Sequence, residues 1–466
     1  MNFTEYNFLL FFLIVFSAYW LLKRTAWQNL LLLVAGFVFY GWVHPWYALL
    51  LGLSIAVDYF IALGIAGDRA HSGRLTALSV LFNVGVLAFF KYGNIIAPGL
   101  ADAFHQFGWE ADFLLKQVIL PAGLSFYTLK KLAYILDVSR GILEPLRDPL
   151  AFGLFISFFP QITAGPIDRA QTLIPQIQSA RVWKADHFHR AWPLIVMGFF
   201  KKIVIANTLA AVVDRVFAYQ HPTRFMLLAA GFTFAIQVLA DFSAYTDLAR
   251  GLARLLGFET SKNFNAPYLS LTPTEFWNRW HITLSTWLRD YIFFPLRRAL
   301  LRARAPGWMS DTLPPIVTML LSGIWHGAGW TYALWGGLFG VLIVVYQWLG
   351  MGGAWKPANR FHAFIAWLVM LFILTALFLI FRAPSLEWLG AAWTTGATLG
   401  TRNELAAALI NLSVTLCFML PLAIKHLLDR AFRPDSNLHA IYYVAATLVM
   451  FVYLNAATPD FIYFRF

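Results

Sequence analysis

The sequence predicts an all-α polytopic membrane protein, a ring of about 11–14 transmembrane, re-entrant and interfacial helices, each span needing ~20 residues. Of its 466 residues, 60% are hydrophobic and only 12% are charged. A soluble domain carries about 25% charged residues. Apolar runs of span length recur along the chain, and most Lys and Arg residues fall in short segments between them. We expect one membrane domain over residues 1–466.

The apolar runs give the expected helical elements in order. The first run follows Glu5 and no basic stretch, so we expect an uncleaved first span and not a signal peptide. Runs are expected near residues 7–22, 27–42, 46–66, 75–90, 113–136, 150–164, 192–213, 225–246, 276–295, 314–323, 330–349, 361–383, 404–426 and 438–456.

The net charge of +12 does not indicate a nucleic-acid partner. Basic residues between apolar runs orient a membrane protein, with the basic segments on the cytoplasmic side. The segment with the most basic residues, 297–304, is therefore expected to be a loop in the cytoplasm. The chain has one cysteine, Cys417, which excludes a disulfide within the chain.

One apolar segment is too long for a single span. Residues 316–349 as one helix would measure about 51 Å at 1.5 Å per residue, against about 30 Å for the hydrocarbon core. Gly323, Gly327 and Gly329 mark the expected break, with His326 at the turn. Irregular backbone at membrane depth is tolerated where it is buried in protein or lines a wet cavity, so we expect His326 to line such a cavity.

Three further stretches interrupt the apolar pattern. Proline and glycine interrupt it at 120–123, and two prolines frame a non-helical turn at 160–166. A polar cluster at 241–247, which contains Asp241 and Tyr245, is expected to close an apolar run. Polar groups inside a membrane are energetically unfavourable, so those that occur there are often functional.

Two histidines are the candidate catalytic groups. Histidine exchanges a proton near neutral pH, which suits acyl transfer to a hydroxyl. On one helix, Trp277, His281 and Ser285 share a face at i, i+4 spacing. A lone histidine is more often a satisfied core residue. Two histidines, His281 and His326, each beside tryptophans and helix breaks, favour the functional interpretation.

Charged and aromatic neighbours complete the candidate site. Arg279 can hold a phosphate or pair with Glu275, and Arg289 can do the same or pair with Asp290. Trp325 can wall the site around His326. Asp241 and Asp247 are candidates for a cation path in a transporter, but their pairing with Arg250, Arg254 or Tyr245 is the favoured interpretation.

Other active-site classes find little support. A catalytic zinc normally takes three protein ligands, and no HExxH spacing occurs among the 11 histidines. The chain contains no GxSxG elbow and no P-loop pattern. We therefore expect no metal and no bound cofactor.

The chain resembles the bacterial membrane-bound O-acyltransferase family, in particular the membrane components of alginate O-acetyltransferases. The matching stretches include LPAGLSFY at 120–127, FPQITAGP at 159–166, GFFKK at 198–202, DFSAYTD at 241–247, EFWNRWH at 275–281, STWLRDY at 285–291 and GIWHG at 323–327. Two departures are Lys130–Lys131 and the stretch 295–300, where those enzymes carry a glycine-rich sequence. They leave the particular polysaccharide open.

The resemblance implies a ring of helices around a central tunnel in the bacterial inner (cytoplasmic) membrane. It implies His326 as the catalytic histidine and His281 as the second functional histidine. The donor would be an acyl thioester on a phosphopantetheine arm, either acetyl-CoA or an acyl carrier protein. The implied partners are an extracytoplasmic subunit resembling an SGNH hydrolase and a polysaccharide export or synthase complex.

Taken together, the residues and the resemblance predict O-acetylation of an exported polysaccharide such as alginate. His326 is expected to act as general base, and His281 to orient the thioester or stabilise the oxyanion. Residues expected to shape the tunnel or bind substrate are Trp277, Arg279, Trp280, Ser285, Trp325, Asp241 and Tyr245. The alternatives are transfer of D-alanyl or another small acyl group to a teichoic-acid-like polymer or lipid, and transport through the membrane.

Overall fold

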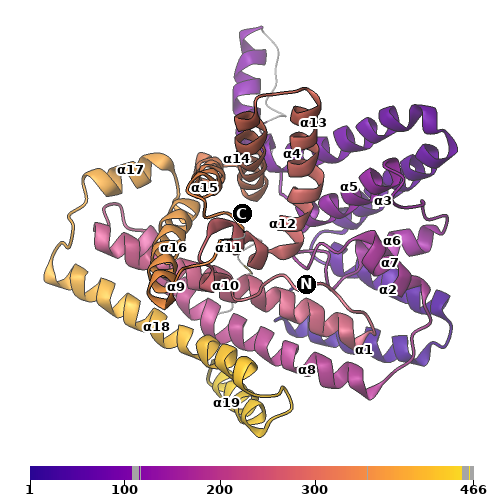
Figure 1. The fold of residues 1–466 in the computed structure, drawn as a ribbon. Coiled ribbons are helices and arrows are strands. Elements are labelled where there is room, and N and C mark those ends of the chain that lie inside the picture. The colour runs from indigo at the N-terminus through magenta and orange to yellow at the C-terminus, as the bar shows by residue number, and fades with distance from the viewer. Residues whose placement is uncertain (108–114, 116, 354, 454–460, 462–466) are drawn as a thin grey trace. The chain divides into compact units, whose positions relative to one another are not determined.

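The computed structural model describes residues 1–107, 115, 117–353, 355–453 and 461 (Figure 1). Over these residues the structure contains helices and no strands. Seven of the helices are long and apolar enough to cross a membrane. The predicted all-α polytopic fold class is therefore confirmed, and the ring around a central tunnel stays a prediction. Residues 113, 114, 116 and 454–456, at the edges of two expected runs, lie outside the described residues.

The chain divides into two compact units. Unit 1 comprises residues 1–189 and 252–261 as far as they are described. Its elements are α1 (Tyr6–Leu21), α2 (Thr25–Gly41), α3 (Pro45–Gly67), η1 (Arg69–His71), α4 (Ser72–Gln106), α5 (Leu124–Ser139), α6 (Pro149–Ser157) and α7 (Ala170–Gln178), with the start of α8 (Ala185–Phe200) and the end of α10 (Arg224–Leu255).

A buried ion pair joins helices α3 and α5 in unit 1. Lys131 Nζ lies 3.2 Å from an Asp58 carboxylate oxygen, and neither side chain is more than 1% exposed. Ser79 and Asn83 of α4 donate hydrogen bonds to the same carboxylate. The neighbouring Lys130 donates to Gln161 on the turn after α6. Asp58 and the two unexpected lysines therefore have a structural role, since a buried charge is stable only when it is paired and hydrogen-bonded.

The two predicted breaks in unit 1 are observed. Gly123 has a left-handed φ of 84° and precedes α5, and residues 158–169 form a turn that follows α6. A side chain at position 123 would meet the carbonyl oxygen of Ile162 at 2.4 Å. Glycine is thus required there by both conformation and space. The expected helices at 113–136 and 150–164 are shorter than predicted, because these breaks start α5 late and end α6 early.

Unit 2 comprises the described residues of 190–251 and 262–466. Besides most of α8 and α10, its elements are η3 (Lys201–Ala206), α9 (Asn207–Phe217), η4 (Pro267–Leu269), α11 (Pro273–Arg279), α12 (Ile282–Leu288), η5 (Arg289–Phe293), α13 (Phe294–Arg302), α14 (Gly307–His326), α15 (Trp330–Trp348), α16 (Arg360–Arg382), α17 (Leu386–Thr394), α18 (Arg402–Ala431) and α19 (Asn437–Tyr453).

Helices α14 and α15 form a tight hairpin in unit 2 (Figure 1). A Cβ added at Gly323 would lie 2.1 Å from the carbonyl oxygen of Tyr332, and one at Gly336 would lie 2.3 Å from that of Met319. Glycine lets two helix backbones approach this closely. The predicted break of the long apolar segment is therefore confirmed, with His326 as the last residue of α14.

Two expectations for unit 2 are wrong. The polar cluster at 241–247 does not close an apolar run, because α10 continues without interruption from Arg224 to Leu255. The basic segment 297–304 is mostly helical: Arg297, Arg298 and Arg302 lie on α13, which packs against α14. The amphipathic pattern of α13 accounts for this, since its charged face can remain solvated while the helix forms.

Candidate active site

His326 is enclosed by aromatic rings at the end of α14. Its side chain is 6% exposed. The ring centroids of Trp325, Trp335 and Phe381 lie 4.9, 5.3 and 5.5 Å from that of His326, each approximately edge to face. Such packing fixes the imidazole plane. The sequence placed His326 at a helix break, and the structure adds the three rings that hold it.

Gly327, which follows His326, packs tightly against Tyr332. Gly327 has an extended backbone, and a Cβ there would lie 2.1 Å from the ring of Tyr332. Tyr332 in turn packs edge to face on Phe381, with ring centroids 4.9 Å apart. The loop from Gly327 to Gly329 therefore holds the imidazole against α15 and α16.

His281 lies between two short helices, and not on a continuous one. Its φ and ψ are 42° and 52°, a left-handed conformation that is uncommon outside glycine. The prediction that Trp277, His281 and Ser285 share one helical face is therefore wrong. The physical reason is a backbone pairing: Asn265 N–H donates to the Arg279 carbonyl at 2.9 Å, and Ile282 N–H donates to the Asn263 carbonyl at 3.0 Å.

The His281 imidazole is completely buried among aromatic rings. It contacts Phe242 of α10 at a centroid distance of 4.7 Å and Trp325 at 6.3 Å. It lies outside the candidate spans, and burial lowers the pKa of His281 to about 3. The neutral imidazole is therefore the stable form, because desolvation disfavours the imidazolium ion. A neutral ring is suited to orienting a substrate by hydrogen bonding.

The tryptophans on and beside α11 join the two histidines. Trp277 contacts Trp335, the wall of the His326 site, at a centroid distance of 5.9 Å. Trp280 packs on Phe264 and Phe378 at 5.0 and 5.4 Å. These tryptophans belong to one continuous aromatic layer with His281 and His326.

Arg279 and Ser285 have local partners. The Arg279 guanidinium lies 2.7 Å from a Glu275 carboxylate oxygen, one turn away on α11. The Ser285 hydroxyl donates to the Trp280 carbonyl at 2.9 Å. The ion-pairing alternative is thus the one observed for Arg279. Arg289 likewise lies 3.2 Å from Asp290.

Asp241 and Tyr245 lie on α10 beside η3. Lys202 Nζ lies 2.8 Å from an Asp241 carboxylate oxygen, with both side chains buried. Lys202 also lies over the ring of Phe461, which contacts Tyr245 at 5.1 Å. Asp241 therefore pairs with Lys202, a partner that the sequence did not suggest. A paired carboxylate of this kind offers no evidence for a cation path.

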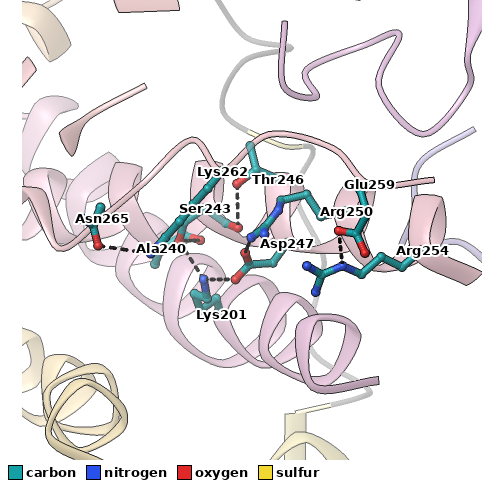
Figure 2. A network of polar contacts seen from close by, with 10 residues as sticks. All are labelled: Lys201, Ala240, Ser243, Thr246, Asp247, Arg250, Arg254, Glu259, Lys262 and Asn265. Carbon is teal, nitrogen blue, oxygen red and sulfur yellow. Dashed lines mark hydrogen bonds and ion pairs between the residues drawn. The ribbon is translucent and has the colours of Figure 1, made fainter. Parts of the chain in front are cut away.

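A more exposed polar cluster surrounds Asp247, nearly two turns further along α10 (Figure 2). Lys201 Nζ lies 2.5 Å from Asp247 and 3.0 Å from the Ser243 hydroxyl, and Arg250 lies 3.8 Å from Asp247. Burial lowers the pKa of nearby Lys262, with Arg250 adding to the effect. The expected pairing of Asp247 with Arg250 is thus observed, while Lys201 is the shorter contact.

Sequence reasoning missed several residues of the site. Trp335, Phe381 and Phe242 contact the two histidines, and Lys202 neutralises Asp241. The signal for Lys202 was available, because a lysine pair inside an apolar run must find carboxylates. No periodicity could reveal Phe381, which lies on α16 and far from His326 in sequence. Among the residues that the structure describes, no group of three or more His, Cys, Asp or Glu side chains is arranged to hold a metal.

Comparison with known proteins gives one family and several relatives. The model of the membrane-bound O-acyltransferase family, MBOAT, matches residues 146–381. The probable alginate O-acetylase AlgI of Pseudomonas aeruginosa is 37% identical over 397 residues, which cover 84% of this chain and 74% of that protein. The peptidoglycan O-acetyltransferase of Helicobacter pylori is 31% identical, covering 78% and 73%. The teichoic acid D-alanyltransferase of Bacillus subtilis is 28% identical, covering 52% and 64%.

Proposed function

Because this chain belongs to the membrane-bound O-acyltransferase family, we propose that it transfers an acetyl group from a cytoplasmic thioester to an exported polysaccharide. It is a multi-pass membrane protein and an acyltransferase. The acetyl group and the polysaccharide acceptor are proposed from the relatives, of which the probable alginate O-acetylases and the peptidoglycan O-acetyltransferase cover most of the chain.

The observation that supports this proposal best is the placement of His326. The imidazole is held by three aromatic rings at the tip of a helical hairpin, next to the glycine-rich turn 327–329. A general base must be held rigidly within reach of the proton that it abstracts. His326 is the base in the proposed reaction, and His281 is the neutral group that orients the thioester.

In the proposed step, the oxygen of the acceptor hydroxyl attacks the thioester carbonyl carbon, and a new ester C–O bond forms. The hydroxyl proton moves to His326, and the C–S bond breaks. The proton then passes from His326 to the sulfur, which leaves as the thiol. A base positioned in this way typically contributes about 10²–10⁴ in rate.

The donor, the location and the partners follow from the same proposal. The donor is an acetyl thioester on a pantetheine arm, carried by coenzyme A or by an acyl carrier protein. The protein works in the bacterial inner membrane, within a system that makes and modifies an exported polysaccharide. The acetyl group reaches the polymer directly or through an extracytoplasmic SGNH-hydrolase-like subunit, whose serine would then be the acceptor hydroxyl.

Transfer of D-alanyl to a teichoic-acid-like polymer is the second candidate function. The similarity to the Bacillus subtilis teichoic acid D-alanyltransferase favours it. The stretch Pro295–Leu300 also replaces a glycine-rich sequence expected in the alginate branch. The identity is lower and covers about half of the chain, so acetyl transfer is the better supported candidate.

Labelling of whole cells tests the proposal. Cells that make this protein, and cells from which its gene is deleted, are fed radiolabelled acetate or radiolabelled D-alanine. We expect acetate label on the exported polysaccharide, released by mild alkali as an ester, and its loss in the deletion strain. Equal acetate label in both strains would overturn the proposal. Gene-dependent D-alanine label would instead support the second candidate.

A further inference from the structure

Two buried hydroxyl groups lie on α14 in the two turns before His326. Ser322 is 0% exposed and Thr318 is 6% exposed. Neither hydroxyl has a hydrogen-bond partner among the residues that the structure describes. Positions 318, 322 and 326 are four residues apart, so the three side chains follow one face of the helix. A buried hydroxyl without a partner is unfavourable, so a ligand that accepts a hydrogen bond from either group would be stabilised there.

Other hydroxyls on the helices of unit 2 behave differently. The Thr312 hydroxyl, also on α14, donates to the Trp308 carbonyl at 2.7 Å, and the Thr375 hydroxyl on α16 donates to the Leu371 carbonyl at 2.9 Å. This bond to the preceding turn is the usual choice of a serine or threonine inside a helix. Ser322 and Thr318 do not make it, and their hydroxyls stay available.

The direction of Ser322 links the hydroxyls to both histidines. A helix turns about 100° per residue, so Ser322 projects between the directions of His326 and Trp325, about 40° from the first and about 60° from the second. The Trp325 ring faces His281 at a centroid distance of 6.3 Å. The Ser322 hydroxyl therefore lies on the side of α14 where the two histidines bound the site.

The spacing of the two hydroxyls along α14 fits the donor of the proposed function. At 1.5 Å per residue, Ser322 lies about 6 Å and Thr318 about 12 Å before His326 along the helix axis. A pantetheine arm carries its sulfur at one end, then an amide, a short methylene spacer and a second amide. The helix begins at Gly307, just after the basic residues of α13, the expected cytoplasmic side. An arm that lies along α14 from that end places its sulfur near His326.

We propose that Ser322 and Thr318 bind the pantetheine arm of the donor through its amide groups. The Ser322 hydroxyl donates to the carbonyl of the amide nearer the sulfur, and the Thr318 hydroxyl donates to that of the farther amide. This inference rests on the proposed function, because it takes a pantetheine thioester as the donor. The two residues bind the arm equally in the ground state and the transition state, and they take no part in proton transfer.

Donors of two lengths test the inference. Inverted membrane vesicles are prepared from cells whose only copy of the gene is wild type, Ser322→Ala, Thr318→Val or the control Thr312→Val. Transfer of the radiolabelled acetyl group is measured with two donors. Acetyl-CoA carries both amides, and S-acetyl-N-acetylcysteamine carries only the amide nearer the sulfur. Loss of one hydrogen bond is expected to raise KM about fivefold, with kcat little changed.

The expected pattern differs between the variants. Ser322→Ala raises KM for both donors, Thr318→Val raises KM for acetyl-CoA alone, and Thr312→Val changes neither. A general folding defect would lower transfer from both donors alike. An equal KM increase for both donors in Thr318→Val would overturn the inference, and so would the absence of a KM increase in both variants. In either case, transfer by the wild type would still support the proposed function. Wild-type vesicles that use neither thioester would overturn both.

Discussion

The imidazole of His281 faces the indole of Trp325, with ring centroids 6.3 Å apart and planes inclined at 68°. The same indole lies 4.9 Å from the ring of His326. Trp325 thus contacts both histidines. Two imidazoles arranged in this way serve separate roles in the proposed reaction, and of the two only His326 lies at the tip of the α14–α15 hairpin.

Replacing His326 by alanine is expected to lower acyl transfer by about 10²–10⁴-fold, because the proposed general base is lost. Insertion into the membrane should be unaffected, since the remaining rings still fill the hairpin. The ester content of the exported polymer measures the effect, with immunoblotting of membranes for abundance. His362→Ala, at the exposed start of α16, is the control and should retain activity. Wild-type ester content in the His326 variant would contradict the catalytic role.

Acidification is expected to destabilise unit 2 through His281. Burial lowers its pKa in the folded protein to about 3, from an ordinary value of 6.5. Between these values the unfolded chain binds more protons than the folded one, so stability falls as the pH falls from about 6.5 towards 3. His281→Gln should remove this contribution. The test compares the pH dependence of thermal unfolding in detergent for the two proteins, and identical slopes would contradict the prediction.

Breaking the buried pair between Lys202 and Asp241 is expected to destabilise the protein by about 3–5 kcal/mol, because it leaves an uncompensated buried charge. Lys202→Met should therefore unfold at lower temperature than the wild type, and adding Asp241→Asn should restore part of the loss. Arg289→Met disrupts an exposed pair with Asp290 and is the matched control. Its effect should stay within about 1 kcal/mol. Equal losses from the lysine and arginine variants would count against the buried pair.

Gly323→Ala is expected to separate α14 from α15 and to lower activity. The new Cβ would lie 2.1 Å from the backbone carbonyl oxygen of Tyr332, which no side-chain rotation can relieve. Overpacking of this kind costs about 1–3 kcal/mol. Gly337→Ala on α15 meets nothing within 4 Å and should be neutral or slightly stabilising. Thermal unfolding and transfer activity are compared for both variants. Loss of activity in both variants would show that the effect does not depend on the close contact at Gly323.

The helix break at His326 could be predicted from the sequence, because the length of an apolar run and the positions of its glycines limit where a helix can end. The run around His326 was too long for one span, and its glycines located the turn. The left-handed residue His281 was not predicted, since helical spacing carries no information on the backbone bonds from residues 263–265. Lys202 and Asp241 come from different helices, and their pairing depends on how η3 packs on α10.

The glycine contacts between α14 and α15 limit how the site can open. Where a carbonyl oxygen touches a neighbouring backbone, there is no side chain that can rotate aside to let the two helices separate. Two helices packed in this way, such as α14 and α15, move together as a rigid body. Admission of a reactant to His326 must therefore come from movement of side chains around the imidazole, and not from separation of α14 and α15.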